Sequence, residues 1–106
     1  MTPTQRTTKE LKDLGYVPVV VEKWNPFVKI RQDLKGVDVL AFKFGEALLA
    51  VQCTTGAHHA DRCDKLRLTG HDRLWKGSGV RLEVWSWDKQ GPRGMRKAWV
   101  LRREVL

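Results

Sequence analysis

The spacing of apolar residues divides the chain into segments with a helical period and segments with the alternation of a strand. Two leucines three residues apart among charged side chains, followed by Gly15, predict an amphipathic helix over residues 4–14. Apolar and β-branched residues dominate residues 16–23 and predict a strand, which Pro18 places at a sheet edge or near a strand start. Residues 27–35 have no clear period and are expected to be irregular.

The clearest strand pair covers residues 37–43 and 47–53, joined by a tight turn over residues 44–46. Both faces of each predicted strand are apolar, which is typical of central strands that are covered on both sides. A three-residue turn places Asp38 directly opposite Gln52, whereas a two-residue turn would shift the register and separate them. Directly opposed side chains have Cβ atoms about 4.5 to 5.5 Å apart. One divalent cation can therefore reach oxygens of both residues.

A helix is predicted over residues 57–68, where the period of the sequence changes. Its apolar positions lie among histidine and charged side chains, namely Ala57, Ala60, Leu66 and Leu68. Thr55 is a candidate N-cap for this helix. Residues 71–75 are expected to add a further turn before a glycine-containing loop over residues 76–79.

Two further strands complete the chain. Residues 80–87 alternate between apolar and polar side chains, residues 88–97 turn the chain, and residues 98–102 return as a second strand. The predicted order is therefore helix, strand, strand, strand, helix, strand, strand. This order predicts an α/β fold with a central mixed sheet.

Length and composition indicate a single domain over residues 1–106. A chain of 106 residues with 42% hydrophobic residues is near the commonest domain size and is long enough for one core. No window approaches the roughly 18 to 20 apolar residues of a membrane span, and the first ten residues lack the apolar run of a signal peptide. We therefore expect a cytoplasmic protein without membrane association. Cys53 and Cys63 are expected to be reduced thiols, because nothing resembles a disulfide framework.

The net charge of +8 favours a polyanionic partner such as DNA, since a positive potential attracts such a ligand whatever the fold. Residues 1–61 hold eight Lys/Arg and seven Asp/Glu, whereas residues 62–106 hold twelve and five. The acidic residues accompany the predicted hairpin, and the basic excess follows it. This distribution suits a small acidic centre framed by a phosphate-binding surface. A solvated charged face on a soluble domain is the alternative.

The layout of the chain resembles the PD-(D/E)XK nuclease superfamily, and more closely its Holliday-junction-resolvase-like branch. The resemblance rests on the order of elements, Glu10 on the first helix, Asp38 early in one strand and the triplet Gln52-Cys53-Thr54 ending the next. Small phage proteins with an Asp…Gln-x-Thr pattern and a basic end are also similar to this chain. The resemblance implies a restriction-endonuclease-like fold and, for a phage-encoded protein, a location in the host cytoplasm.

The resemblance also implies roles for particular residues. In this superfamily an aspartate and a glutamate bind Mg²⁺, a lysine orients or activates the attacking water, and a glutamate on the first helix often completes the site. By position, Asp38 matches the aspartate, Gln52 stands at the glutamate, Thr54 stands at the lysine, and Glu10 is the candidate for the first-helix acid. The implied cofactor is Mg²⁺ or Mn²⁺, held by Asp38 and Gln52.

Two departures from the family pattern bear on catalysis. The Gln52 carbonyl can bind a hard cation, but a neutral ligand holds it less tightly than a carboxylate does. Thr54 has no charge with which to stabilise an attacking hydroxide or a developing negative charge. Lys65 on the following helix is a candidate replacement for the lysine, as are Lys29 and Lys35 before the hairpin. Lys43 is a poor candidate, because it lies on the opposite face of its strand from Asp38.

Basic side chains after the hairpin are the candidates for contacts to DNA phosphates. They fall in two groups, on the predicted helix (Arg62, Lys65 and Arg67) and in the predicted loop (Lys89, Arg93, Arg96 and Lys97). A solvated helix face and a ligand-free basic loop are the alternatives for the two groups. Most of the five tryptophans are expected in the core, with one or two exposed for stacking.

A zinc site is not expected from the sequence. Four residues invite such an interpretation, namely His58, His59, Cys63 and His71. No pair among them has a recognised metal-ligand spacing together with a second matching pair. The histidines are therefore expected at the surface, and Cys63 is expected to be a buried thiol. Cys53 is expected in the core.

Taken together, these features favour a small nuclease that binds DNA, branched or junction DNA included. It would hydrolyse phosphodiesters with Mg²⁺ or Mn²⁺ at Asp38 and Gln52. A two-fold homodimer is the natural way for so small a protein to gain reach on DNA. Two alternatives stay open, a catalytically inactive nuclease fold that binds nucleic acid, and a basic adaptor that contacts an acidic protein.

Overall fold

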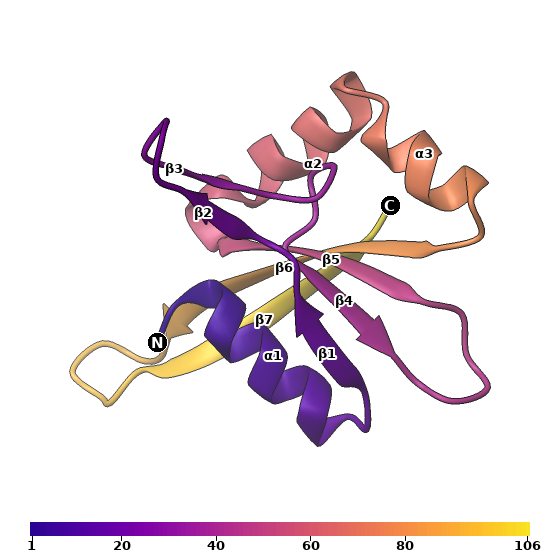
Figure 1. The fold of residues 1–106 in the computed structure, drawn as a ribbon. Helices are drawn as coiled ribbons and strands as arrows, with labels where there is room; N and C mark the ends of the chain where they lie inside the picture. Colours follow the sequence, from indigo (N-terminus) through magenta and orange to yellow (C-terminus); the bar gives the residue numbers. More distant parts are fainter.

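The structure, a computed structural model, describes residues 1–106 as an α/β fold built on one mixed sheet (Figure 1). The sheet has five strands in the order β1-β4-β5-β6-β7, with the bounds β1 (Val17–Val20), β4 (Val39–Phe42), β5 (Leu49–Thr55), β6 (Arg81–Gln90) and β7 (Ala98–Val105). Strands β5 and β6 are parallel, and the other neighbours are antiparallel. The three helices are α1 (Pro3–Asp13), α2 (His59–Leu68) and α3 (His71–Gly77), and the short 3-10 helix η1 (Gly56–His58) precedes α2.

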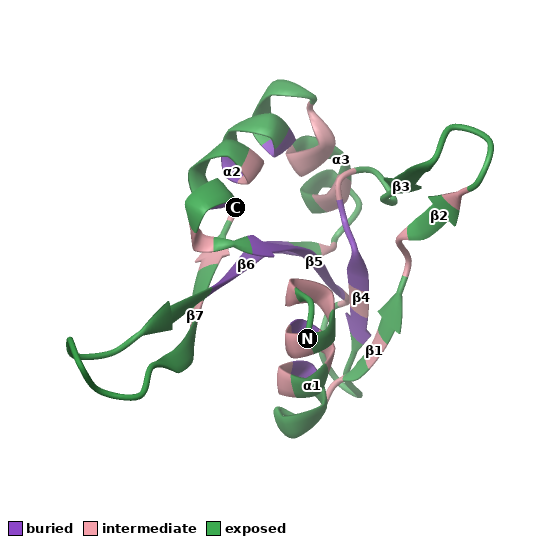
Figure 2. Ribbon diagram, turned by 90° about the vertical axis from the view of Figure 1, so that its left-hand side faces the viewer, coloured by how far each residue is buried: buried purple, intermediate pink, exposed green.

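The helices cover the sheet from both sides (Figure 2). Helix α1 packs through Leu11 on one face, against a cluster that includes Val51 and Trp85. Helix α2 packs through Cys63 and Leu66 on the other face. Because successive residues of a strand point to opposite faces, β5 contributes to both cores and is buried from Leu49 to Thr54. The sequence prediction of central strands covered on both faces is confirmed for β5.

Helix α1 spans Pro3–Asp13, one residue earlier at each end than the predicted range of 4–14. Thr2 accepts a hydrogen bond from the Gln5 backbone N–H, and the Gln5 side chain accepts one from the Thr2 N–H, which is a complete capping box. Gly15 follows the helix with a φ of 90°, a left-handed conformation that favours glycine. The sheet edge predicted from Pro18 is also confirmed, because β1 is an edge strand of the sheet.

The register of the hairpin β4–β5 agrees with the prediction, although its strands are shorter on the side of the turn. Val39 pairs with Val51 and Ala41 pairs with Leu49, which places Asp38 across from Gln52 when the register is extended by one residue. The connection runs over residues 43–48 rather than 44–46. The pairing register is nevertheless the predicted one, because it keeps the apolar residues of both strands in the two cores.

The predicted strand over residues 16–23 ends at Val20, and a small separate hairpin reaches into the segment 27–35 expected to be irregular. Strands β2 (Lys23–Asn25) and β3 (Ile30–Gln32) pair with each other and not with the main sheet. The Asn25 side chain accepts hydrogen bonds from the backbone N–H groups of Phe27 and Val28, and Lys29 has a φ of 52°. These local contacts form the turn. The sequence of this segment has no hydrophobic alternation from which a strand pair could be predicted.

The second half of the chain differs from its prediction in three places. Helix α2 buries His59, Cys63 and Leu66, whereas the predicted core positions Ala57, Ala60 and Leu68 are exposed. His59 can be buried because polar partners on the sheet satisfy its ring. The Thr55 side chain makes no capping hydrogen bond. Residues 71–77 form the distinct helix α3, and β6 continues to Gln90, so that the basic loop is reduced to residues 91–97.

Candidate functional site

The predicted pair of Asp38 and Gln52 is formed, with Asp38 just before β4 and Gln52 in the middle of β5. The Gln52 side-chain amide donates a hydrogen bond of 2.9 Å to Asp38 Oδ2, and the backbone N–H of Cys53 donates another of 2.9 Å to the same oxygen. Asp38 and Gln52 are 6% and 5% exposed. The hairpin register therefore brings these two side chains into direct contact at a nearly buried position.

The orientation of the Gln52 amide determines what this pair can bind. Its nitrogen donates to Asp38 and, at 3.2 Å, to the Cys53 carbonyl. The amide must turn over before its oxygen can join Asp38 around a cation. Oxygen donors of this kind are those that Mg²⁺ and Mn²⁺ prefer, so the residues present fit a hard divalent cation.

Two further carboxylates surround Asp38, and the sequence analysis missed both. Glu22 and Asp33 line the same hollow as Asp38, together with Arg31 and Arg62. Burial, opposed in part by the Cys53 N–H and reinforced by the negative charges of Glu22 and Asp33, raises the pKa of Asp38 to about 7. The approach of Glu22 depends on the antiparallel pairing of β1 with β4, in which the Val21 N–H donates to the Asp38 carbonyl, and no sequence pattern specifies this pairing.

A basic hollow adjoins the acidic one. Its lining includes Arg62, Lys65 and His71, and it shares Gln52, Asp33 and Arg62 with the acidic hollow. Helix α2 positions Arg62 and Lys65 three residues apart, on the side of the helix that faces β5 near Gln52. Of the candidate replacement lysines, Lys65 therefore lines a hollow together with Gln52.

Other predicted site residues lie apart from Asp38. Glu10 lines a separate hollow with Arg6 and Trp87 on the α1 side of the sheet, so the prediction that it completes the site is wrong for this structure. Thr54 is buried beside Ser86 and lines neither hollow. Lys43 donates to the Leu14 carbonyl, which confirms that it points away. Lys29 and Lys35 line neither hollow.

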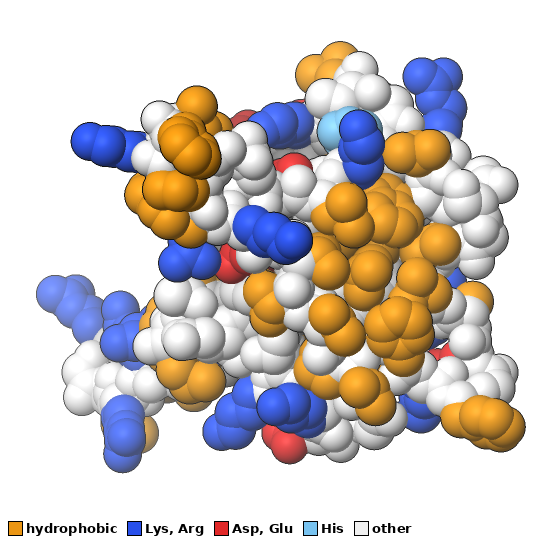
Figure 3. Space-filling view, in the orientation of Figure 1, with side chains coloured by type: hydrophobic (Ala, Val, Ile, Leu, Met, Phe, Trp, Pro, Cys, Tyr) orange, Lys and Arg blue, Asp and Glu red, His pale blue; other side chains and the backbone are white.

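The predicted phosphate-contacting residues divide between the helix and the loop. Arg67 lies 3.8 Å from Asp64 and 3.6 Å from Glu104, so acidic neighbours partly neutralise it. The residues of the β6–β7 loop, including Arg93, Arg96 and Lys97, are exposed. Figure 3 shows basic side chains on the left-hand side, where the β2–β3 and β6–β7 hairpins project, with acidic atoms between them.

Trp99 on β7 adds a partly exposed aromatic surface beside the basic loop. Arg6 lies 3.7 Å from its ring centroid, and Lys89 lies 5.4 Å from the same centroid. Trp85 and Trp87 are buried, as expected of most tryptophans, whereas Trp24 and Trp99 are exposed. Trp99 therefore combines partial exposure with two neighbouring cations.

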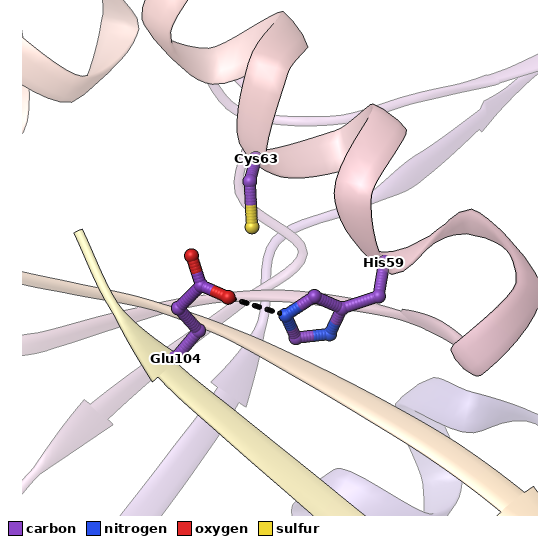
Figure 4. Close-up of side chains that lie close together, drawn as sticks. All are labelled: His59, Cys63 and Glu104. Atoms are coloured by element: carbon purple, nitrogen blue, oxygen red, sulfur yellow. Dashed lines mark hydrogen bonds and ion pairs between the residues drawn. The ribbon is translucent and has the colours of Figure 1, made fainter.

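A second polar cluster lies on the same face of the sheet, under α2 (Figure 4). Donor atoms of His59, Cys63 and Glu104 all lie within 4.8 Å of one another. His59 is 1% exposed and contacts Ser86 Oγ at 2.6 Å and Glu104 at 2.9 Å. The expectation of a surface histidine is therefore wrong for His59, because partners from β6 and β7 satisfy both of its ring nitrogens. The expectations of buried thiols at Cys53 and Cys63 are confirmed.

Comparison with known proteins found no match among family models, curated proteins or solved structures. The longest helix, α1, has 11 residues, and no helix combines the length and the hydropathy that a membrane span requires.

Proposed function

We propose that the protein is a DNA-hydrolysing enzyme that requires Mg²⁺ or Mn²⁺ and has a restriction-endonuclease-like architecture. One observation carries this proposal, the direct contact between an acidic hollow around Asp38 and a basic hollow around Lys65, with Gln52 and Arg62 in both. Hydrolysis of a phosphodiester needs a cation beside the scissile phosphate and positive charge on its oxygens. The two adjoining hollows offer both requirements within one site.

The residues of the site divide this work. Asp38 and the Gln52 carbonyl would hold the metal, with Glu22 as a third acidic neighbour. A metal bound there would supply Lewis-acid activation of water and charge stabilisation at the phosphate. Arg62 and Lys65 bind the phosphate oxygens, and Lys65 takes the place of the lysine that the family has where this chain has Thr54.

Contacts outside the site would hold the DNA. The β6–β7 loop with Arg93, Arg96 and Lys97 offers an exposed basic surface for the phosphate backbone, and Trp99 offers a stacking surface. A two-fold homodimer would extend this reach to two strands or to a junction. Exposed apolar side chains of β1 and β4, including Val17 and Phe42, gather on one surface that a second protein chain can cover (Figure 3).

A second candidate function is DNA binding without cleavage. The hydrogen bond from Gln52 to Asp38 supports this candidate, because it stabilises the contact between these two side chains without a cation. Thr54, which supplies no positive charge, supports it as well. The third candidate, an adaptor for an acidic protein, is favoured by the apolar surface of β1 and β4 together with the net charge of +8.

The test is cleavage of linear, single-stranded and four-way-junction DNA in Mg²⁺, Mn²⁺ and EDTA. We expect metal-dependent cleavage by the native chain and at least about 100-fold slower cleavage by Asp38→Ala. The matched control is Glu10→Gln, whose carboxylate lies in a separate hollow and whose substitution leaves the rate unchanged.

The outcome also separates the three candidates. Binding to DNA without cleavage under any metal would overturn the enzyme and support the binding protein. Phosphate contacts make affinity fall steeply as salt rises, whereas an adaptor has little affinity for DNA at any salt.

A further inference from the structure

The cluster of His59, Cys63 and Glu104 has the composition of a transition-metal site and not of a magnesium site. An imidazole, a thiol and a carboxylate converge there, with donor atoms within 4.8 Å of one another. Thiolate and imidazole ligands select Zn²⁺ over Mg²⁺, Mn²⁺ and Ca²⁺, which prefer oxygen. His59 and Cys63 lie four residues apart on α2, so both side chains leave the same face of the helix. Glu104 reaches them from β7 (Figure 4).

We propose that His59, Cys63 and Glu104 bind one Zn²⁺ ion that links helix α2 to strand β7. Donors on one tetrahedral Zn²⁺ ion lie roughly 3.3 to 3.8 Å apart, given Zn–ligand distances of about 2.0 to 2.3 Å. The distance of 2.9 Å between His59 Nε2 and Glu104 Oε1 and the span of 4.8 Å over the cluster bracket that range. Small side-chain rotations therefore suffice to bring all three donors to the ion.

The contact between His59 and Ser86 prepares the ring for this role. His59 Nδ1 lies 2.6 Å from Ser86 Oγ, and the opposite ring nitrogen points toward Glu104 and Cys63. When Nδ1–H donates to Ser86, Nε2 presents its lone pair to the ion, which is the usual arrangement of a metal-bound histidine. Binding releases the thiol proton of Cys63, while the neutral His59 ring keeps its one proton on Nδ1.

The charges around the cluster balance the ion. A thiolate and a carboxylate neutralise the two positive charges of Zn²⁺ without help from the rest of the protein. Arg67 and Arg102 lie 3.6 and 3.4 Å from the Glu104 carboxylate, and both side chains are at least half exposed. They can move into solvent when the ion takes their place.

Three protein donors leave the fourth position of a tetrahedral Zn²⁺ ion to water. His59 and Cys63 are buried, Glu104 is partly exposed, and none of the three lines a hollow of the structure. The ion would fix α2, which carries Arg62 and Lys65, on the sheet. The inference does not depend on DNA cleavage, since the cluster lies outside both hollows.

The experiment is metal titration of the full chain after removal of bound metal with EDTA, in a reducing buffer without thiols. Zn²⁺ is titrated by calorimetry, and Co²⁺ serves as a spectroscopic probe of the same site. We expect one Zn²⁺ per chain, a raised melting temperature, and a thiolate-to-cobalt charge-transfer band with tetrahedral intensity.

The variants distinguish ligands from supporting residues. Cys63→Ser should weaken Zn²⁺ binding by more than about 100-fold and abolish the charge-transfer band, whereas Ser86→Ala, which only orients His59, should weaken it by roughly 10- to 100-fold. Cys53→Ser, at the other buried cysteine, and Asp38→Asn should leave both the stoichiometry and the band unchanged. Glu104→Gln tests the third ligand without opening a cavity.

Three results would overturn the proposal. The first is absence of Zn²⁺ binding by the folded native chain, and the second is a Co²⁺ complex without the thiolate band. The third is Zn²⁺ binding that persists in Cys63→Ser or disappears in Asp38→Asn, since either would place the ion elsewhere. Circular dichroism of each variant establishes that it is folded.

Discussion

The two polar clusters under α2 differ in how the chain assembles them. Asp38 and Gln52 belong to neighbouring strands of one hairpin, and their contact follows from its register. His59, Cys63 and Glu104 come from one helix and from the last strand, and parallel pairing of β5 with β6 followed by antiparallel pairing of β6 with β7 brings them together. One cluster is therefore local in sequence, and the other exists only after the whole sheet has formed.

The clusters also differ in how burial is compensated. His59 has a partner at each ring nitrogen, so its burial leaves no polar group unsatisfied. Asp38 accepts two hydrogen bonds, but it is buried and lies among other carboxylates, so its ionised form is destabilised. An arrangement that raises the energy of a buried charge is typical of sites that bind a ligand or act chemically, whereas the satisfied contacts of His59 stabilise the fold even without a metal ion.

The largest expected effect is on the pH dependence of stability, through Asp38. Its pKa is 3.8 in a model peptide and about 7 in the folded chain, so the folded state holds an extra proton between these values. Without divalent metal, stability should fall by up to about 4 kcal/mol as pH rises from about 4 to above 7. Urea unfolding at a series of pH values measures this loss.

Asp38→Asn is the matched control, since it keeps the shape of the side chain and cannot titrate. Its stability should be nearly flat over the same range. Mn²⁺ should stabilise the native chain more at pH 8 than at pH 5.5, because the cation competes with the proton for Asp38. An equal slope in both proteins would show that Asp38 does not carry the raised pKa.

The next largest effect is on the rate of cleavage, through Lys65, which lines the same hollow as Gln52. Lys65→Ala should slow metal-dependent cleavage by about 100-fold, or roughly 2.7 kcal/mol, because a positive charge near the scissile phosphate is lost. Lys76→Ala, an exposed lysine on α3, is the control and should cleave at the native rate. Equal rates for the native chain and Lys65→Ala would remove Lys65 from the site.

A smaller effect is expected at His59. In EDTA, His59→Ala should lower the free energy of unfolding by about 2 kcal/mol, because Ser86 and Glu104 lose their partner and a buried volume is emptied. His58→Ala, at the exposed neighbouring histidine, should change it by less than about 0.5 kcal/mol. Chemical denaturation compares the two, and similar losses would argue against the satisfied network.

The smallest effect is expected in the β6–β7 loop, far along the sheet from both clusters. Removing two basic side chains together, in Arg93→Ala/Arg96→Ala, should weaken DNA binding by about 10-fold at low salt and reduce the salt dependence by about two phosphate contacts. Fluorescence anisotropy over a salt series measures both quantities. Unchanged affinity and salt slope would exclude the loop from the DNA interface.

Much of the site around Asp38 and Gln52 could be predicted from the sequence, because it depends on residues that are close together in the chain. The apolar faces of both strands fix their register, so the contact of Asp38 with Gln52 follows from the pattern alone. The position of Lys65 near that pair follows from the helix after β5. Glu22 was missed because its approach to Asp38 depends on the pairing of β1 with β4, which a sequence pattern does not specify.

The sequence by itself determined the α/β class, the central hairpin, the first helix with its glycine stop and the contact between Asp38 and Gln52. These features depend on periodicity, on glycine at a helix end and on a register that only one arrangement of apolar residues satisfies. The tertiary structure alone decided that Glu10 lies in a separate hollow, that β2 and β3 leave the main sheet and that α2 buries His59. The physical reason is that a buried polar side chain is stable only beside its partners, and Ser86 and Glu104 reach His59 only when β6 and β7 are in place.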